Sequence, residues 1–239
     1  MKRASAVLLA AVALAACAGE EEGASTQRTA SSETTAAASE PETLPGQGET
    51  RALDAASRST LQRVRAMKDR YAVVDERLGE GVRAVSGFDS KVHCWTLAGW
   101  HRLERIHGTA PDSLAGLADI FSLHIHLHPN ICDELHALLA GERPQTGPDA
   151  LALAGALVAL THEGMHLTSV GSNEAAAECK AIQNAHEVGV RLGVEEEYGH
   201  RLALIYWEEL YRADDPVYGS PQCQDGGSLD VNPDSSVWP

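Results

Sequence analysis

The stretch "LALAGALVALTHEGMHLTSVGSNEAAAEC", residues 151–179, decides the fold because it encodes two consecutive helices with polar residues near their junction. Its first half consists almost entirely of Ala, Leu, Val and Gly, which predicts a helix buried on most sides. We expect that helix to break at Gly171. Ser172 or Asn173 then caps a second helix that runs to Gly193.

Two histidines of this stretch, His162 and His166, are four residues apart and therefore share one face of the first helix. This spacing suits two imidazoles bound to one metal ion. Glu163 points beside that pair, where it can reach a water on the metal without being a ligand. Zinc would lower the pKa of such a water to about 7, and the carboxylate could take its proton. Polar side chains on an apolar helix need partners, and a metal ion supplies one.

A third ligand is expected from the second helix. Glu174 follows His166 by eight residues, across the helix break. In a tight antiparallel hairpin its carboxylate would complete a His-His-Glu set and leave a fourth position for water. Glu178 lies one turn further on, level with His162, where it could accept the other ring N–H of that histidine. We favour this arrangement, and the alternative with Glu178 as the ligand stays open.

The pattern "HEGMH" followed by "NEAAAE" resembles the gluzincin branch of the zincin metallopeptidases. The resemblance implies a zincin-like helical domain with an active-site helix hairpin and a small sheet or single edge strand. It also implies roles for five residues: zinc ligands His162, His166 and Glu174, general base Glu163, and orienting acid Glu178. The gap between the two motifs is much shorter than in thermolysin-like enzymes, so the substrate-binding elements must come from elsewhere.

Around the hairpin the sequence predicts a mainly α (α+β) domain. Amphipathic or capped patterns predict helices over four further segments: 61–78, 96–108 with cap Thr96 and stop Gly108, 130–140 with cap Asn130, and 195–213. The stretch "DIFSLHIHLHP", residues 119–129, alternates strictly and predicts a strand. Its apolar face carries Leu123, Ile125 and Leu127, and its other face carries His124, His126 and His128.

The histidine row has two interpretations. It could be a second metal site or line the groove beside the zinc, since in zincin folds an edge strand lies over the active helix and pairs with extended peptide. The favoured alternative is a solvent-facing strand surface, because no carboxylate is interleaved to orient the imidazoles. Hydrolases of this type usually also provide a donor for the oxyanion, and Tyr206, Tyr211 and Tyr218 are candidates by chain position.

The N-terminus predicts export and membrane anchoring. Residues 1–16 have the basic start and short apolar run of a signal peptide, and "LAAC" ending at Cys17 resembles a bacterial lipobox. The resemblance implies acylation of Cys17, including palmitate, and stable attachment to the lipid membrane. Residues 17–50 form a Ser-, Thr-, Glu- and Pro-rich tether that cannot bury a core, and residues 51–239 form one domain. The domain also resembles a group of uncharacterised exported actinobacterial lipoproteins, through "HCW", "NEAAAEC" and "CQDGGSLDVNP".

Charge and cysteines restrict the partners and the compartment. Without the signal peptide the chain has 17 basic and 34 acidic residues, a net charge of −17, which argues against nucleic acid as a partner. The four domain cysteines predict two disulfides in an oxidising compartment. Three pairings are possible, and we favour Cys94–Cys132 with Cys179–Cys223, because the second would tie the C-terminal tail to the helix after the histidine motif. Cysteine metal ligands are disfavoured because no C-x-x-C spacing occurs.

Together these features predict a membrane-anchored, extracytoplasmic zinc (Zn²⁺)-dependent hydrolase, more narrowly a metallopeptidase with a zinc-activated water and Glu163 as general base. Its partners would be the lipid membrane and a peptide substrate, with no nucleic acid; the sequence does not indicate an oligomeric state. The alternative is a non-catalytic envelope lipoprotein that binds metal or scaffolds a partner.

Overall fold

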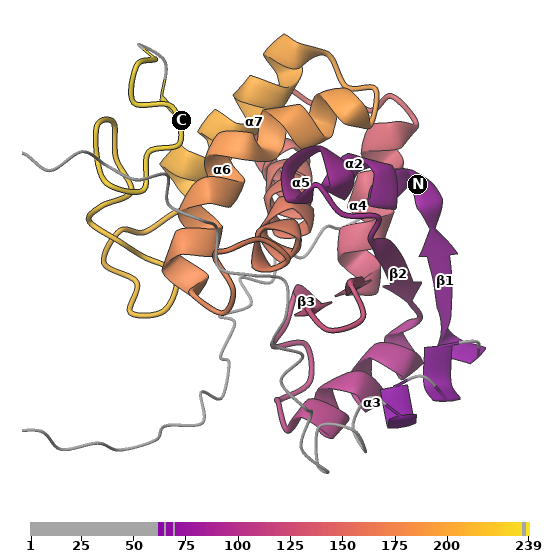
Figure 1. Ribbon diagram of the computed structural model, residues 1–239. Coiled ribbons are helices and arrows are strands. Elements are labelled where there is room, and N and C mark those ends of the chain that lie inside the picture. Colours follow the sequence, from indigo (N-terminus) through magenta and orange to yellow (C-terminus); the bar gives the residue numbers. More distant parts are fainter. Residues whose placement is uncertain (1–61, 65, 69, 236–237) are drawn as a thin grey trace, which may run out of the picture.

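The computed structural model describes residues 62–64, 66–68, 70–235 and 238–239, and it shows a mainly helical α+β fold with one small sheet (Figure 1). The predicted fold class is confirmed. The expected signal peptide, acylated Cys17 and tether lie outside the described residues. Among the helices in the described part of the chain, none combines the length and apolar character needed to cross a membrane.

The sheet has four strands in the order β1-β2-β4-β3. Their bounds are β1 Ala72–Asp75, β2 Lys91–Trp95, β3 Gly116–Asp119 and β4 His124–Leu127. Strand β1 is antiparallel to β2, β2 is parallel to β4, and β3 is antiparallel to β4. The predicted histidine-rich strand is β4, and it lies in the interior of the sheet. An edge position for this strand is therefore wrong, and β3 is the edge strand that contacts α5.

The single helix predicted over residues 61–78 is also wrong. The chain is helical at residues 62–64, 66–68 and 70–71, then forms β1, and then begins helix α2, Glu76–Ser86. Spacings of three and four residues in the apolar pattern fit a helix. The β-branched pair Val73-Val74 instead pairs with β2, a contact that local periodicity does not encode. Asp75 then caps α2 by accepting a hydrogen bond from the Leu78 amide at 3.0 Å.

Helix α2 contains two glycines. Gly79 and Gly81 are buried there, and a Cβ on Gly79 would lie 2.6 Å from the carbonyl oxygen of Ser90. These glycines therefore permit close packing of α2 on its neighbours. The helix ends at Gly87, whose φ of 74° is left-handed and whose amide donates to the carbonyl of Arg83.

The main core lies between helices on one face of the sheet. Helices α5 (Gly147–His166), α6 (Glu174–Arg191) and α7 (Glu196–Glu209) pack against one another, and α2 and α4 (Pro129–Leu139) pack on α5 (Figure 1). Their fully buried side chains include Leu157, Leu160, Ile182 and Leu202. A smaller cluster with Trp95, Trp100 and Leu103 forms beside helix α3 (Leu97–His107).

Most predicted caps are confirmed. Thr96 accepts from the Gly99 amide at the start of α3, Gly108 ends that helix, and Asn173 accepts from the Ala176 amide at the start of α6. The predicted cap Asn130 is wrong. Helix α4 begins one residue earlier, at Pro129, and His128 Nδ1 accepts from the Asn130 amide at 3.1 Å.

Two disulfides join the chain in the pairing expected from the sequence. Cys94 of β2 is bonded to Cys132 of α4, and Cys179 of α6 is bonded to Cys223 of the C-terminal tail. The tail is held further along by Gln183, which donates to the Leu229 carbonyl and accepts from the Val231 amide. Figure 1 shows the tail, in yellow, beside α6.

The packing around Gly79 predicts that substitution of this residue destabilises the protein. Alanine is the better helix former by about 1 kcal/mol, yet Gly79→Ala should lower the free energy of unfolding by roughly 1–3 kcal/mol because its Cβ meets the Ser90 backbone. Gly155→Ala in α5 is the matched control, since its Cβ would touch only Leu210 at 3.7 Å. Urea unfolding should show Gly155→Ala at least as stable as wild type. Equal effects of both substitutions would contradict the packing argument.

Candidate metal centre

The hairpin between α5 and α6 brings the three predicted metal ligands together. His162 and His166 lie in the last turns of α5, and Glu174 is the first residue of α6. The two Nε2 atoms are 2.9 Å apart, and Glu174 Oε2 is 3.1 Å from that of His162 and 3.3 Å from that of His166. Ligands about 2.0–2.1 Å from a tetrahedral zinc lie roughly 3.3 Å apart. The spacing of the three atoms is therefore close to that of a metal ligand set, and these residues could hold a metal ion.

The outer ring nitrogens fix which tautomer each histidine adopts. His166 Nδ1 lies 2.5 Å from the carbonyl oxygen of Gly171, and His162 Nδ1 lies 2.7 Å from Glu178 Oε2. A carbonyl oxygen only accepts, and a carboxylate accepts when ionised, so each Nδ1–H is the donor. In the neutral rings both Nε2 atoms then carry lone pairs that face each other and Glu174.

Three lone-pair atoms this close repel one another unless a positive charge lies among them. Burial opposes a charge on His162, but its hydrogen bonds with Glu174 and Glu178 outweigh burial and raise its pKa to about 10. Burial raises the pKa of the Glu174 carboxyl, but hydrogen bonds from His162 and His166 lower it to about 2. The hydrogen bonds of the cluster therefore favour a positive charge among these atoms, which a proton or a metal ion could supply.

Glu178 contacts the outer nitrogen of His162 and lies away from the two Nε2 atoms. One of its oxygens accepts from His162 Nδ1, and the other accepts from the hydroxyl of Tyr206 in α7. Its side chain is buried, and both oxygens are used away from the two Nε2 atoms. The geometry thus corresponds to the favoured arrangement, in which Glu178 orients His162, and not to the alternative with Glu178 as the ligand.

Glu163 lies beside the cluster, against the edge strand β3. It is buried, and a Cβ on Gly116 of β3 would lie 2.6 Å from its Oε1 atom. A side chain at position 116 would have to displace the Glu163 carboxylate. Burial raises the pKa of Glu163, although His162 and His166 oppose the shift. The Glu163 carboxyl is therefore protonated more readily than that of an exposed glutamate.

Three tyrosines were candidates for a donor near the site, and their hydroxyls differ. Tyr206 donates to Glu178, and Tyr211 donates to the Ser220 carbonyl at 3.2 Å. The Tyr218 hydroxyl is buried and has no hydrogen-bond partner among the described residues. The Tyr218 ring centroid lies 5.8 Å from that of His162. The structure thus separates one unpartnered tyrosine from two with structural bonds.

Sequence reasoning missed two backbone positions of this site. Gly171 supplies the carbonyl that orients His166, and Gly116 makes room for Glu163. Gly171 was recognised as a helix break, and its left-handed φ of 58° agrees with that role. Nothing local to Gly116 indicates its function, because its partner is 47 residues away in the chain.

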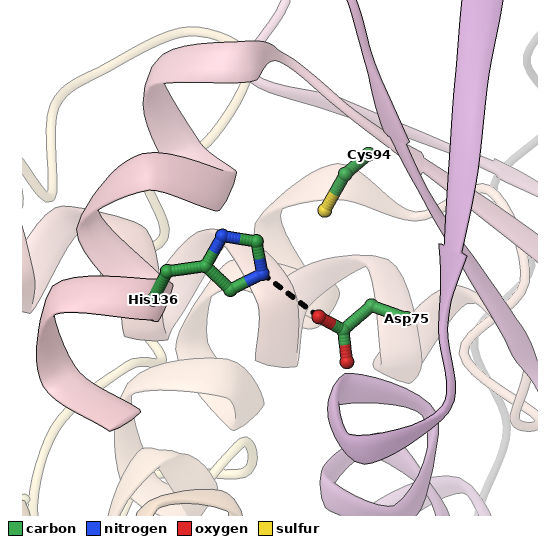
Figure 2. A group of neighbouring side chains, drawn as sticks. All are labelled: Asp75, Cys94 and His136. Atoms are coloured by element: carbon green, nitrogen blue, oxygen red, sulfur yellow. Dashed lines mark hydrogen bonds and ion pairs between the residues drawn. The ribbon is translucent and has the colours of Figure 1, made fainter. Parts of the chain in front are cut away.

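A second group of potential ligands, Asp75, Cys94 and His136, is excluded as a site of this kind. Figure 2 shows His136 Nε2 paired with Asp75, 2.8 Å from its Oδ2, with the Cys94 sulfur nearby. That sulfur is bonded to Cys132 and is no thiolate. The ion pair between Asp75 and His136 remains, and it links α4 to the cap of α2.

A third group of potential ligands consists of His101, Glu104 and Asp112, and its hydrogen bonds stabilise a loop. The fully buried Glu104 carboxylate accepts from the amides of Asp112 and Ser113, at 3.1 and 3.0 Å. Asp112 Oδ1 lies 2.9 Å from His101 Nε2 and 3.4 Å from His128 Nε2. The carboxylates are thus already used to fix the turn after α3.

Of the histidine row, His126 and His128 are buried and His124 is half-buried, so its interpretation as a solvent-facing surface is wrong. Only 2% of His126 is exposed, and its Nδ1 accepts from the Trp95 indole N–H at 3.1 Å. His93 of β2 joins this face, with its Nε2 3.2 Å from His124 Nδ1. The row lies on the sheet face opposite Ile125 and the α5 core. It therefore does not line the proposed metal centre.

Comparison with known proteins assigns neither a family nor a function to this chain. The chain matches no protein-family model, and it has no significant match to a curated protein or to a solved structure. The interpretation of the centre therefore rests on the geometry of its own residues.

The buried imidazoles predict acid sensitivity. Burial, with Lys68 and His124 nearby, lowers the pKa of His93 from 6.5 to about 4. Between these values the unfolded state binds a proton that the folded state excludes, so the free energy of unfolding falls as pH falls from about 6.5 to about 4. His93→Phe should remove roughly 1–2 kcal/mol of the loss between pH 7 and pH 5, measured by urea unfolding. An unchanged difference between the two pH values would contradict this role.

Proposed function

We propose that this chain binds zinc through His162, His166 and Glu174 and is an extracytoplasmic zinc-dependent hydrolase, more narrowly a metallopeptidase of gluzincin type. The proposal rests on the close spacing of three potential ligand atoms, the two histidine Nε2 atoms and Glu174 Oε2, which lie 2.9–3.3 Å apart. The Nδ1 atom of each histidine is held in place by a separate hydrogen bond. Two imidazoles and one carboxylate are a set that catalytic zinc sites use, with one position left open. The sequence resemblance of the two motifs supports the same assignment.

Different residues of the chain would carry out different parts of the reaction. Zinc, when bound, would act as a Lewis acid that polarises a carbonyl and makes water a nucleophile near neutral pH. Glu163 is adjacent in the chain to His162 and buried against β3, so it would take the proton from the attacking water and return it to the leaving amine. Glu178, held by Tyr206, would keep the His162 ring in its metal-binding tautomer.

The proposed setting is the outer face of a membrane, with the chain anchored through acylated Cys17. Two disulfides are typical of proteins outside the cytoplasm. The acidity of the chain argues against nucleic acid, and a peptide is the proposed substrate.

Metal content tests the centre directly. Wild-type protein, purified without a histidine tag and loaded with zinc, should retain about one zinc per chain after dialysis, measured by mass spectrometry of the metal. Glu174→Ala should weaken zinc binding by about 100-fold or more, because it removes a ligand and not merely an outer partner. Glu187→Ala, an exposed acid on the same helix, is the control and should keep wild-type zinc content. A wild-type protein that retains no zinc would refute the metal centre.

Substitution of Glu163 separates an enzyme from a metal-binding scaffold. Glu163→Gln should keep the zinc content of wild type and lower hydrolysis of a peptide, identified by a library screen, by about 10²–10⁴-fold. The amide fills the same volume but cannot take a proton from water. Wild-type protein that binds zinc yet cleaves nothing in the screen would favour the non-catalytic alternative. Unchanged cleavage by the variant would remove Glu163 from the mechanism.

A further inference from the structure

The C-terminal tail carries Tyr218 to the metal centre in a fixed conformation. Asp215 Oδ1 accepts from the amides of Val217 and Tyr218, each at 2.8 Å, and the Asp215 carbonyl accepts from the Gly219 amide at 3.0 Å. A Cβ on Gly219 would lie 2.5 Å from the Arg212 carbonyl oxygen, so the turn is closely packed. Four residues beyond this turn, Cys223 is bonded to Cys179 of α6. The position of Tyr218 is thus set by backbone bonds and a disulfide, and not by its own hydroxyl.

The hydroxyl of Tyr218 is a buried polar group. It has no hydrogen-bond partner within the part of the chain that the structure describes. Buried hydroxyls without a partner are uncommon, and each one needs an explanation. Tyr206 and Tyr211, from the neighbouring helix and its end, both use their hydroxyls within the fold.

The surroundings of Tyr218 indicate which kind of partner its hydroxyl would take. Its ring contacts that of His162, with the centroids 5.8 Å apart. A tyrosine hydroxyl ordinarily has a pKa of about 10, well above neutral pH. The group is therefore an O–H donor near neutral pH, and none of the described residues supplies its acceptor.

We propose that Tyr218 donates a hydrogen bond to an oxygen of the ligand bound at His162, His166 and Glu174, and so acts as the oxyanion donor of the site. This inference rests on the proposed metal centre. During amide hydrolysis the water oxygen bonds to the carbonyl carbon, its proton passes to Glu163, and the carbonyl electron pair moves onto oxygen. A donor aimed at that oxygen stabilises the new charge until the C–N bond breaks and the amine takes the proton.

Binding of acetohydroxamate tests this role without a known substrate, because this small molecule binds zinc through oxygen and presents an acceptor oxygen beside it. Zinc-loaded wild type, Tyr218→Phe and Tyr198→Phe are compared by isothermal titration calorimetry, and the zinc content of each is measured separately. Tyr198 is the matched control, since its hydroxyl donates to the Pro144 carbonyl, a contact outside the metal centre. Tyr218→Phe should bind zinc as wild type does and acetohydroxamate roughly tenfold more weakly, which corresponds to about 1.4 kcal/mol. Tyr198→Phe should match wild type for both ligands.

The outcomes separate this inference from the function on which it rests. A wild-type chain that holds no zinc overturns the metal centre and this inference together. Zinc-loaded wild type that does not bind acetohydroxamate, or a Tyr218→Phe variant that binds it as tightly as wild type, overturns the role of Tyr218 alone. Loss of zinc from Tyr218→Phe, with zinc kept by Tyr198→Phe, also overturns it, because Tyr218 would then be a metal ligand and not a donor.

Discussion

The antiparallel packing of α5 on α6 is the constraint on which the rest of the site depends. A short connection between the helices places His166 opposite Glu174, and the same antiparallel course places His162 opposite Glu178. Each histidine therefore donates a hydrogen bond to one acceptor through Nδ1. Its Nε2 atom lies next to the Nε2 atom of the other histidine and to Glu174. The tightness of the pair follows from its small residues, since Ala154, Ala177 and Ala181 lie buried in the core that the two helices share.

Two elements from distant parts of the chain complete the surroundings of this hairpin. Strand β3 brings Gly116 against Glu163, and the C-terminal tail brings Tyr218 beside His162. The tail is held by Cys179–Cys223, and Cys179 directly follows Glu178 in α6. The disulfide thus joins the tail to the turn of α6 that contacts His162. It therefore fixes Glu178 and Tyr218 relative to each other on either side of His162.

The two histidine groups of this domain show how neighbours decide the chemistry of an imidazole. On α5 the rings face carboxylates, which raise the pKa of His162 and favour a cation. On the sheet the rings face one another and Lys68, and burial dominates, so the pKa of His93 is lowered. The same residue type therefore forms a cluster that could hold a cation in one place and a packed layer with lowered histidine pKa values in the other.

The sequence by itself determined the helix hairpin and the cluster of His162, His166 and Glu174, because these depend on helical spacing and a short connection. It left three pairings of the domain cysteines possible, and the structure contains the favoured one. Only the tertiary structure decided that residues 72–75 form a strand, that His126 and His128 are buried, and that Gly116 and Tyr218 border the site. Each of these features depends on a partner distant in the chain. The strand needs β2, the histidines are covered by the layer around Trp95, and Gly116 and Tyr218 contact the end of α5. Local patterns record which face of a segment is apolar, but not which distant segment covers it.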